Sequence, residues 1–216
     1  MAWAAGASSA PFAVQLGDAR VVLDAPAGYA DTTFMGSPRL QEIAEALTSA
    51  SNRVLLFAIS DDDLRRFSVG DPPELRRYML VATPKALERE RLDASAFERM
   101  AADAMRGFTP LPEGSDIAKA LENQPVGQAS ALAELRRDPA VRSLLQGTRL
   151  PPTKIPRLFG SDERQNFMLS SSTLMLVRGK ALSLHLFTGY ESAQDAAWVR
   201  AATAQWVDQL QRLNGH

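Results

Sequence analysis

Few side chains in this sequence are suited to acid–base or nucleophilic chemistry. The chain contains two histidines, His185 and the terminal His216, and no cysteine. Histidine is the side chain that most readily exchanges protons at neutral pH, and the missing cysteine removes thiol nucleophiles, disulfides and cysteine-ligated metals. A metal site with two histidine ligands would require the end of the chain to fold back onto residue 185. Because His185 alternates with leucines between residues 182 and 187, we interpret it as a structural residue in the middle of a strand.

Three consecutive aspartates, Asp61 to Asp63, form the most prominent acidic cluster. Carboxylates could bind Mg²⁺ or Ca²⁺, or could serve a carboxylate-dependent hydrolase. However, adjacent residues point in different directions, and the spacing of an EF-hand loop is absent. Aspartate also favours the first turn of a helix, where the positive end of the helix dipole attracts it. We therefore interpret DDDLRRF as the beginning of a helix and predict no metal site.

A basic stretch lies later in the chain, where six cationic residues fall within residues 136–157 and only Asp138 opposes them. The six are Arg136, Arg137, Arg142, Arg149, Lys154 and Arg157. This local excess of positive charge predicts contact with a protein or another anionic partner. The alternative is that acidic residues from elsewhere in the chain, such as Asp61 to Asp63 or Glu163, neutralise it. The stretch lacks interleaved aromatic residues, so we do not expect it to bind single-stranded nucleic acid.

Whole-chain properties exclude several further classes of protein. The sequence has neither a glycine-rich phosphate loop nor the G-x-S-x-G turn of serine hydrolases. We therefore predict no nucleotide or other cofactor. The formal net charge of −1 gives no global attraction to nucleic acid or to an anionic membrane. No run approaches the roughly 18 apolar residues of a membrane span.

The first residues, MAWAAGASSA, are small and rich in alanine. We predict a flexible tail over residues 1–10, followed by one domain over residues 11–216. Ala2 to Ala4 and Ala5 to Ala7 both have the small-x-small pattern of a signal cleavage site. The tail is therefore interpreted as the remnant of a signal region, in an exported protein of the periplasm or the extracellular space. A cytoplasmic protein with a disordered tail is the alternative.

Adjacent pairs of strands, rather than alternating strands and helices, are predicted for the first half of the domain. Residues 12–26 are typical of a hairpin that turns at Gly17-Asp18, and residues 37–50 of a helix capped by Ser37. Strands are expected at 53–60 and 76–84. A second helix follows, with Ser95 and Glu98 at the spacing of a capping box. Paired strands with helices packed on them define an α+β domain with an antiparallel sheet.

Residues 109–164 differ from their surroundings. Seven of the 13 prolines lie between Pro110 and Pro156. Proline and glycine interrupt the pattern, and short helical pieces are expected at 115–123, 129–137 and 139–146. The segment is therefore predicted to be an irregular helical and loop insert packed on the rim of the sheet.

The most strongly patterned stretch covers residues 172–190. It predicts a hairpin at the centre of the sheet, in which Leu182, Leu184 and Leu186 share one face. The turn lies at Arg178 to Lys180, and its register stays open. A two-residue loop is expected to place Val177 opposite Leu182, and a three-residue loop Leu176.

The chain ends in an amphipathic stretch with Ser192 and Asp195 at capping distance. Val199, Ala202, Trp206 and Leu210 share one face of it, and Gly215 follows where a helix would end. These residues predict a long C-terminal helix packed on the sheet.

Several of these features together resemble the Mog1/PsbP-like families. The features that resemble these families are Pro26, Gly28 and Tyr29 after the first strands, the apolar hairpin with its basic glycine turn at residues 177–181, and Trp198 in the last helix. The resemblance covers about half of the chain and misses residues 109–164. It implies an antiparallel sheet flanked by helices and an accessory or binding role, and it assigns no functional residues.

We thus expect a non-catalytic binding or accessory module that meets a partner through its surface. A carboxylate-dependent hydrolase and a carrier of a small apolar ligand are the alternatives. Convergent acids in a cleft would favour the hydrolase, and a dry apolar pocket the carrier. An exposed apolar patch on a flat surface would favour the binding module.

Overall fold

Nine strands and five α-helices follow one another in the computed structural model, which describes residues 10–156 and 161–215 and the side chains outside 153–165. The strands are β1 (Phe12–Leu16), β2 (Ala19–Leu23), β3 (Tyr29–Asp31), β4 (Asn52–Ser60), β5 (Arg77–Pro84), β6 (Ala129–Asp138), β7 (Val141–Pro156), β8 (Ser161–Val177) and β9 (Lys180–Gly189). The helices are α1 (Pro38–Ala46), α2 (Asp61–Ser68), α3 (Ala94–Ala104), α4 (Ile117–Glu122) and α5 (Ala193–Asn214), with a 3₁₀ turn at Lys85–Leu87. The predicted α+β class is confirmed. The export hypothesis concerns residues 1–9, which lie outside the described residues, and it stays a prediction.

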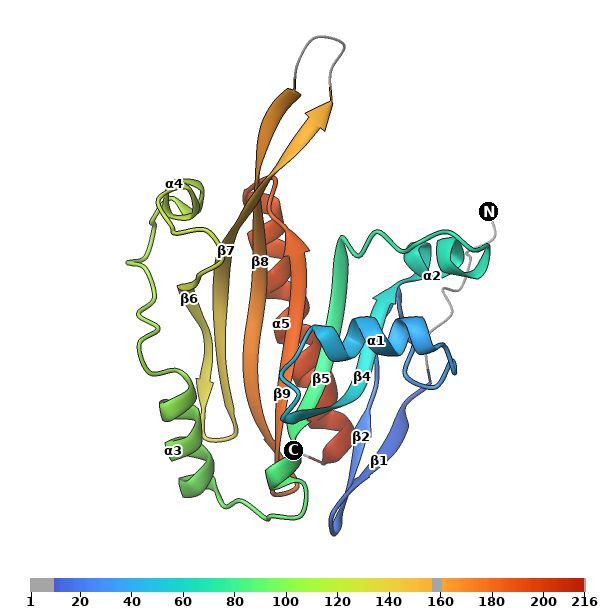
Figure 1. Ribbon diagram of the computed structural model, residues 1–216. Coiled ribbons are helices and arrows are strands. Elements are labelled where there is room, and N and C mark those ends of the chain that lie inside the picture. The colour runs from blue at the N-terminus through green and yellow to red at the C-terminus, as the bar shows by residue number, and fades with distance from the viewer. Residues whose placement is uncertain (1–9, 157–160, 216) are drawn as a thin grey trace, which may run out of the picture.

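One antiparallel sheet carries the fold. Its strand order is β3-β4-β5-β9-β8-β7-β6, and β1 and β2 form a separate hairpin. In Figure 1, α5 runs behind this sheet while α1 crosses in front of β4 and β5. Each face of the sheet is therefore covered by a different helix.

The apolar residues divide into two cores accordingly. The main core joins the sheet to α5 and to the β1–β2 hairpin, and Trp206 and the leucines of β9 belong to it. The α1 core packs Leu40 and Ala44 of α1 on Phe57, Tyr78 and Leu80 of β4 and β5. Strand alternation explains the division, because successive side chains point to opposite faces.

The β8–β9 hairpin turns at Arg178-Gly179, where both residues have positive φ, 51° and 81°. A two-residue loop with this geometry matches the twist of the strands. Val177 pairs with Lys180, and Met175 with Leu182, so both registers expected from the sequence are wrong. The error arose because Lys180 belongs to the strand. Its side chain is 1% exposed, and its Nζ donates to the Glu90 carbonyl at 2.7 Å and pairs with Asp18 at 3.0 Å.

The predicted helical insert at 109–164 is mostly wrong. Only α4 lies where a helix was expected, while residues 129–137 and 139–146 form β6 and the start of β7. Bulges in the β6–β7 pairing break the alternation of β6, which hides its strand pattern in the sequence. Pro151 and Pro152 fall where the β7–β8 register shifts, a position at which a strand tolerates proline. Residues 129–138 and 141–156 of this segment are thus integral strands of the sheet.

The helix starts follow the sequence with one exception, and α1 ends at Ala46, before the expected end at residue 50. Ser192 and Asp195 form the predicted capping box of α5, and Gly215 ends that helix in the left-handed conformation. At α3, however, the cap is Asp93, whose carboxylate accepts from the Ala96 N–H at 2.7 Å. Ser95 instead accepts a hydrogen bond from Arg99. The predicted capping box of α3 is therefore wrong.

A substitution at Leu184 tests whether β9 lies at the centre of the sheet. Its side chain is 2% exposed and lies in the main core. We expect Leu184→Ala to lower the free energy of unfolding by about 2–5 kcal/mol, because truncation leaves a cavity and loses apolar burial. Denaturant unfolding measures the change. A loss below about 1 kcal/mol would contradict this placement.

Candidate functional site

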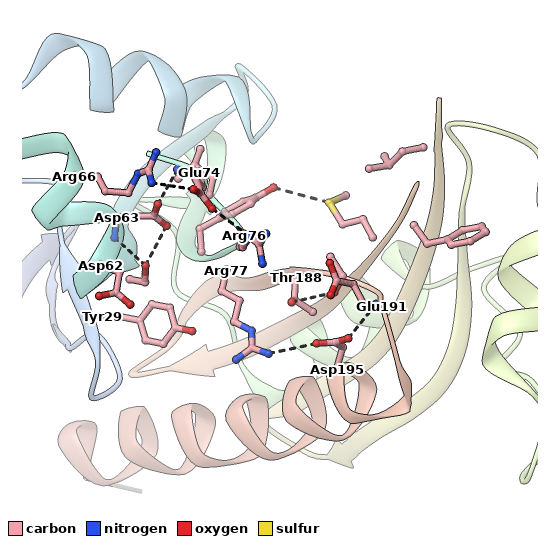
Figure 2. Close-up of a pocket in the computed structure, with 17 residues that line it drawn as sticks. Tyr29, Asp62, Asp63, Arg66, Glu74, Arg76, Arg77, Thr188, Glu191 and Asp195 are labelled. Carbon is pink, nitrogen blue, oxygen red and sulfur yellow. Dashed lines mark hydrogen bonds and ion pairs between the residues drawn. The ribbon is translucent and has the colours of Figure 1, made fainter. Parts of the chain in front are cut away.

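A cleft of about 900 Å³ opens at the end of the sheet where β5 begins and β9 ends. Figure 2 shows its two charged sides: α2 and the following loop contribute one, and the start of α5 with the end of β9 contributes the other. The strand pairing of Arg77 with Thr188 brings these two parts of the chain together. The cleft therefore forms only when β5 and β9 pair.

Asp63 holds the first side in place. It lies in the first turn of α2, is 5% exposed, and exchanges hydrogen bonds with the N-cap residue Ser60. Its Oδ1 accepts from the Glu74 N–H at 2.7 Å, which ties the loop after α2 back to the helix. The prediction that Asp61 to Asp63 begin a helix is confirmed. Asp62 is exposed and pairs with Arg65.

Leu75 decides which way the loop presents its charges. Its φ of 51° is unusual for a residue with a side chain, and its side chain packs against the α1 core. The neighbouring Glu74 and Arg76 lie in the wall of the cleft. The Glu74 carboxylate forms ion pairs with Arg66 at 2.9 Å and with Arg76 at 3.2 Å. One carboxylate thus holds two guanidinium groups at the rim.

Arg77 and Asp195 form the second side. Arg77 Nη2 lies 3.3 Å from Asp195 Oδ1, and the guanidinium carbon lies 4.1 Å from the ring centroid of Trp198. Burial opposes ionisation of Asp195. The N–H groups of Glu191 and Ser192 and the Arg77 guanidinium outweigh burial and lower the pKa of Asp195. Asp195 is therefore a fixed anion that orients Arg77.

An apolar strip lies between the two sides. It contains Tyr78 from β5, Leu150 from β7, and Phe167 and Met168 from β8. Tyr29 adds an aromatic ring from β3, and burial raises the pKa of its hydroxyl, so the phenol stays protonated at neutral pH. The cleft offers an apolar surface bordered by guanidinium groups and carboxylates.

This arrangement suits recognition better than proton transfer. General acids and bases work best when their pKa lies near the working pH. In the cleft, Asp195 is held ionised and Tyr29 is held protonated, and the described lining residues include no histidine. The arginines, by contrast, are oriented by carboxylates and keep free donor edges for a ligand.

His185 lies outside the cleft, in the middle of β9 as predicted. It faces away from α5, and its ring stacks near Phe187 with centroids 6.1 Å apart. Burial lowers the pKa of its imidazole to about 4. The ring is therefore neutral at pH 7.

The basic stretch does not gather on one surface of the described residues. Arg136 pairs with Asp138 and with Asp208 of α5, at 2.6 Å each. On the other face of the sheet, Arg142 pairs with Glu98 of α3 at 3.2 Å.

Of the other predicted basic residues, Arg137 pairs with Glu134 at 2.6 Å, and Arg149 donates to the Glu122 carbonyl at 2.8 Å. The Lys154 side chain and Arg157 lie outside the described residues. Asp138 within the stretch, and Asp208, Glu134 and Glu98 outside it, thus pair with the three arginines nearest its start. The role of the stretch in partner binding stays a prediction.

Two properties of the described residues bear on the functions that the sequence left open. Among the side chains that the structure describes, those of residues 10–152 and 166–215, no three from histidine, aspartate or glutamate are grouped to hold a metal ion. In the same part of the chain, no helix is both long and apolar enough to span a membrane.

Comparison with protein families and with curated proteins found no match. Among solved structures, the fold is similar to that of the Saccharomyces cerevisiae Ran-binding protein Mog1p, with a TM-score of 0.38 and 12% identity over 96% of this chain and 93% of that chain. A mutant of Mog1 aligns with a TM-score of 0.37 and 11% identity over 95% and 93% of the two chains. These values confirm the weak, fold-level resemblance expected from the sequence, and they do not extend to partners.

Most of the cleft was not predicted from the sequence. Asp61 to Asp63 were considered, and Asp195 was considered only as a helix cap, whereas Arg66, Glu74 and Arg77 were not. Two features of the sequence pointed to this site: the arginine pairs at residues 65–66 and 76–77, and the loop with the sequence GDPPE between them. Neither shows which strand end the arginines face.

Asp63 provides the first test of the site. We expect Asp63→Ala to lower the free energy of unfolding by about 1–3 kcal/mol, because the Glu74 N–H and the Ser60 hydroxyl lose a buried partner. Amide exchange at Glu74 should accelerate. The exposed neighbour supplies the control, since Asp62→Ala should cost less than about 1 kcal/mol. Equal effects of the two variants would contradict the role of Asp63.

His185 provides a pH test. Its pKa is about 4 in the folded chain, against an ordinary value of 6.5. Between these values the unfolded chain binds more protons, so stability falls as the pH drops through this window, by at most about 1.4 kcal/mol per pH unit. His185→Gln should flatten this dependence, and His216→Gln should not. An imidazole NMR titration with a midpoint near 6.5 for His185 would contradict the prediction.

Proposed function

We propose that the protein is a non-catalytic binding module that receives a segment of a partner protein in the cleft between α2 and the start of α5. One observation carries the proposal: oriented guanidinium groups stand on both sides of an apolar strip. Arginine, tyrosine, phenylalanine and methionine are enriched at protein–protein interfaces, and arginine and tyrosine often dominate their binding energy.

The size and charge of the cleft indicate the kind of segment that fits. A volume of about 900 Å³ lies within the range of ligand pockets. Apolar side chains of the partner would cover Phe167 and Met168. Flanking acidic groups would bind Arg76, whose side chain is 78% exposed, and the free edge of Arg77. Basic groups would face the carboxylates of Glu74 and Asp195.

The two alternative functions have less support from the contacts. A carboxylate-dependent hydrolase would need a carboxyl group free to act on substrate, but Asp63 is engaged by Ser60 and the Glu74 N–H. A carrier of a small apolar ligand would need a mostly apolar pocket. Charged side chains border the apolar strip instead.

The test is affinity capture of partners from native extract, with the recovered proteins quantified by mass spectrometry. The cleft variant Arg76→Ala/Phe167→Ala is compared with wild type and with a distant control, Arg99→Ala/Arg106→Ala, on α3 and in the turn after it. We expect the cleft variant alone to lose a partner. That partner, once purified, should bind the cleft variant at least tenfold more weakly in calorimetry, since removal of a dominant contact costs more than about 1.4 kcal/mol.

Thermal melting must show that both variants stay folded. Recovery of the same partners at the same yield with the cleft variant would show that the cleft is not the binding site.

A further inference from the structure

A second surface lies at the outer edge of β4, away from the cleft. β3 pairs with β4 only at Ala58–Ser60. The chain then turns away: Thr32 N donates to the Phe57 carbonyl at 2.8 Å, and the Phe57 N–H donates to Thr33 Oγ1 at 3.1 Å. Among the described residues, no strand pairs with this edge over residues 52–56.

A pocket of about 610 Å³ adjoins this unpaired edge, between α1 and β4. Its apolar lining comes from three buried side chains, Leu40 and Ala44 of α1 and Phe57 of β4, and from the half-buried Val54 of β4. Hydroxyl and amide groups such as Thr33 and Gln41 surround that surface. The pocket therefore lies beside backbone groups that can form sheet hydrogen bonds.

We propose that this edge is a strand-addition site, which binds an extended peptide segment of a partner protein as a neighbour of β4. In this mode of recognition, backbone hydrogen bonds supply affinity, and pockets for alternate side chains supply specificity. An apolar side chain of the peptide would enter the pocket under α1. The next side chain along the peptide would point to the other face of the sheet.

Charge at one end of the edge determines the chemistry of the peptide. Arg53 pairs with Glu88 at 3.1 Å, whereas the Nζ of Lys85 donates to the Ala50 carbonyl at 2.8 Å. Lys85 has no carboxylate partner among the described residues and lies at the pocket rim beside Arg53. A peptide with an acidic residue at this end complements the local charge.

Two further features indicate a short peptide with an apolar anchor. A register shift between Val54 and Leu56 bends the edge, which disfavours pairing with a long flat strand. The loop that leaves β3 exposes Phe34 and Met35, with 72% and 46% of their surface accessible. They follow Thr33, whose Oγ1 accepts from the Phe57 N–H, so they offer apolar surface near that end of the edge, where Phe34 also packs edge-on against Phe12.

The proposal is tested by panning a phage-displayed library of random nine-residue peptides against the full chain. We expect selected sequences to share an acidic residue near one end and apolar residues at alternate positions. The best sequence, synthesised with fluorescein, is then titrated by fluorescence polarisation. Failure to select such a family of peptides would overturn the proposal.

Variants locate the bound peptide. Gln41 is an exposed α1 residue at the pocket, so Gln41→Trp should block it and weaken binding of the fluorescein peptide at least tenfold. Lys85→Glu should also weaken binding, and more strongly at low salt. Arg106→Glu, in the turn after α3, is the matched surface control and should bind as wild type does. Equal binding by Gln41→Trp and wild type would overturn the proposal.

Two readouts distinguish strand addition from side-chain contact in the pocket alone and from binding in the cleft. Peptide binding should slow amide exchange in residues 52–56, and unchanged exchange there would contradict backbone pairing. The cleft variant Arg76→Ala/Phe167→Ala should keep full peptide affinity, so this proposal stands or falls independently of the proposed function.

Two other occupants of the edge are tested as alternatives: a second copy of this chain and the N-terminal segment of the same chain. If light scattering shows a dimer that Gln41→Trp converts to a monomer, a second copy occupies the edge. If deletion of residues 1–9 raises peptide affinity tenfold, the N-terminal segment of the same chain competes for it. Either result would overturn the assignment to a partner protein.

Discussion

The pairing of β5 with β9 holds the two halves of the sheet together. β3, β4 and β5 come from the first part of the chain, β6 to β9 from the second, and this pairing is the junction between them in the strand order. At one end, Thr83 donates to the Ala181 carbonyl at 2.9 Å, buried from solvent. At the other end, Arg77 lies opposite Thr188. The cleft at this second end exists because strands distant in sequence meet there.

The charged groups of the cleft contribute little to that architecture. Exposed ion pairs such as Arg76 with Glu74 stabilise a fold by at most about 1 kcal/mol. They restrict the positions of the guanidinium groups, which under the proposed function would lower the entropic cost of binding a partner segment. Asp63 is different, since it is buried and satisfies the backbone of the loop that bears Glu74 and Arg76. Stability and the proposed recognition thus depend on different side chains of the same wall.

The cleft and the β4 edge use different physical properties of one sheet. At the cleft, the sheet positions side chains from its strand ends. At the edge, the backbone itself would be the binding surface, because β3 pairs with β4 only over Ala58–Ser60. The helices α1 and α2 flank these two surfaces. Both helices lie in the part of the chain that precedes the long β7–β8 hairpin. Strands β6 to β8 extend the sheet on the side away from β4.

The sequence by itself determined the parts of this protein that depend on local pattern. The alternating leucines of β9 and the capping box of α5 were predicted correctly, because strand period and cap chemistry act within a few residues. The aspartates that begin α2 follow from the helix dipole in the same way. Tertiary structure decided the features that depend on pairing between distant segments. β6 was expected to be helical because its bulges remove the strand pattern, and only its ladder with β7 makes it a strand. Arg77 belongs to the site because β9 pairs with β5 and leads into α5, which brings Asp195 beside Arg77. No local spacing in the sequence encodes this proximity.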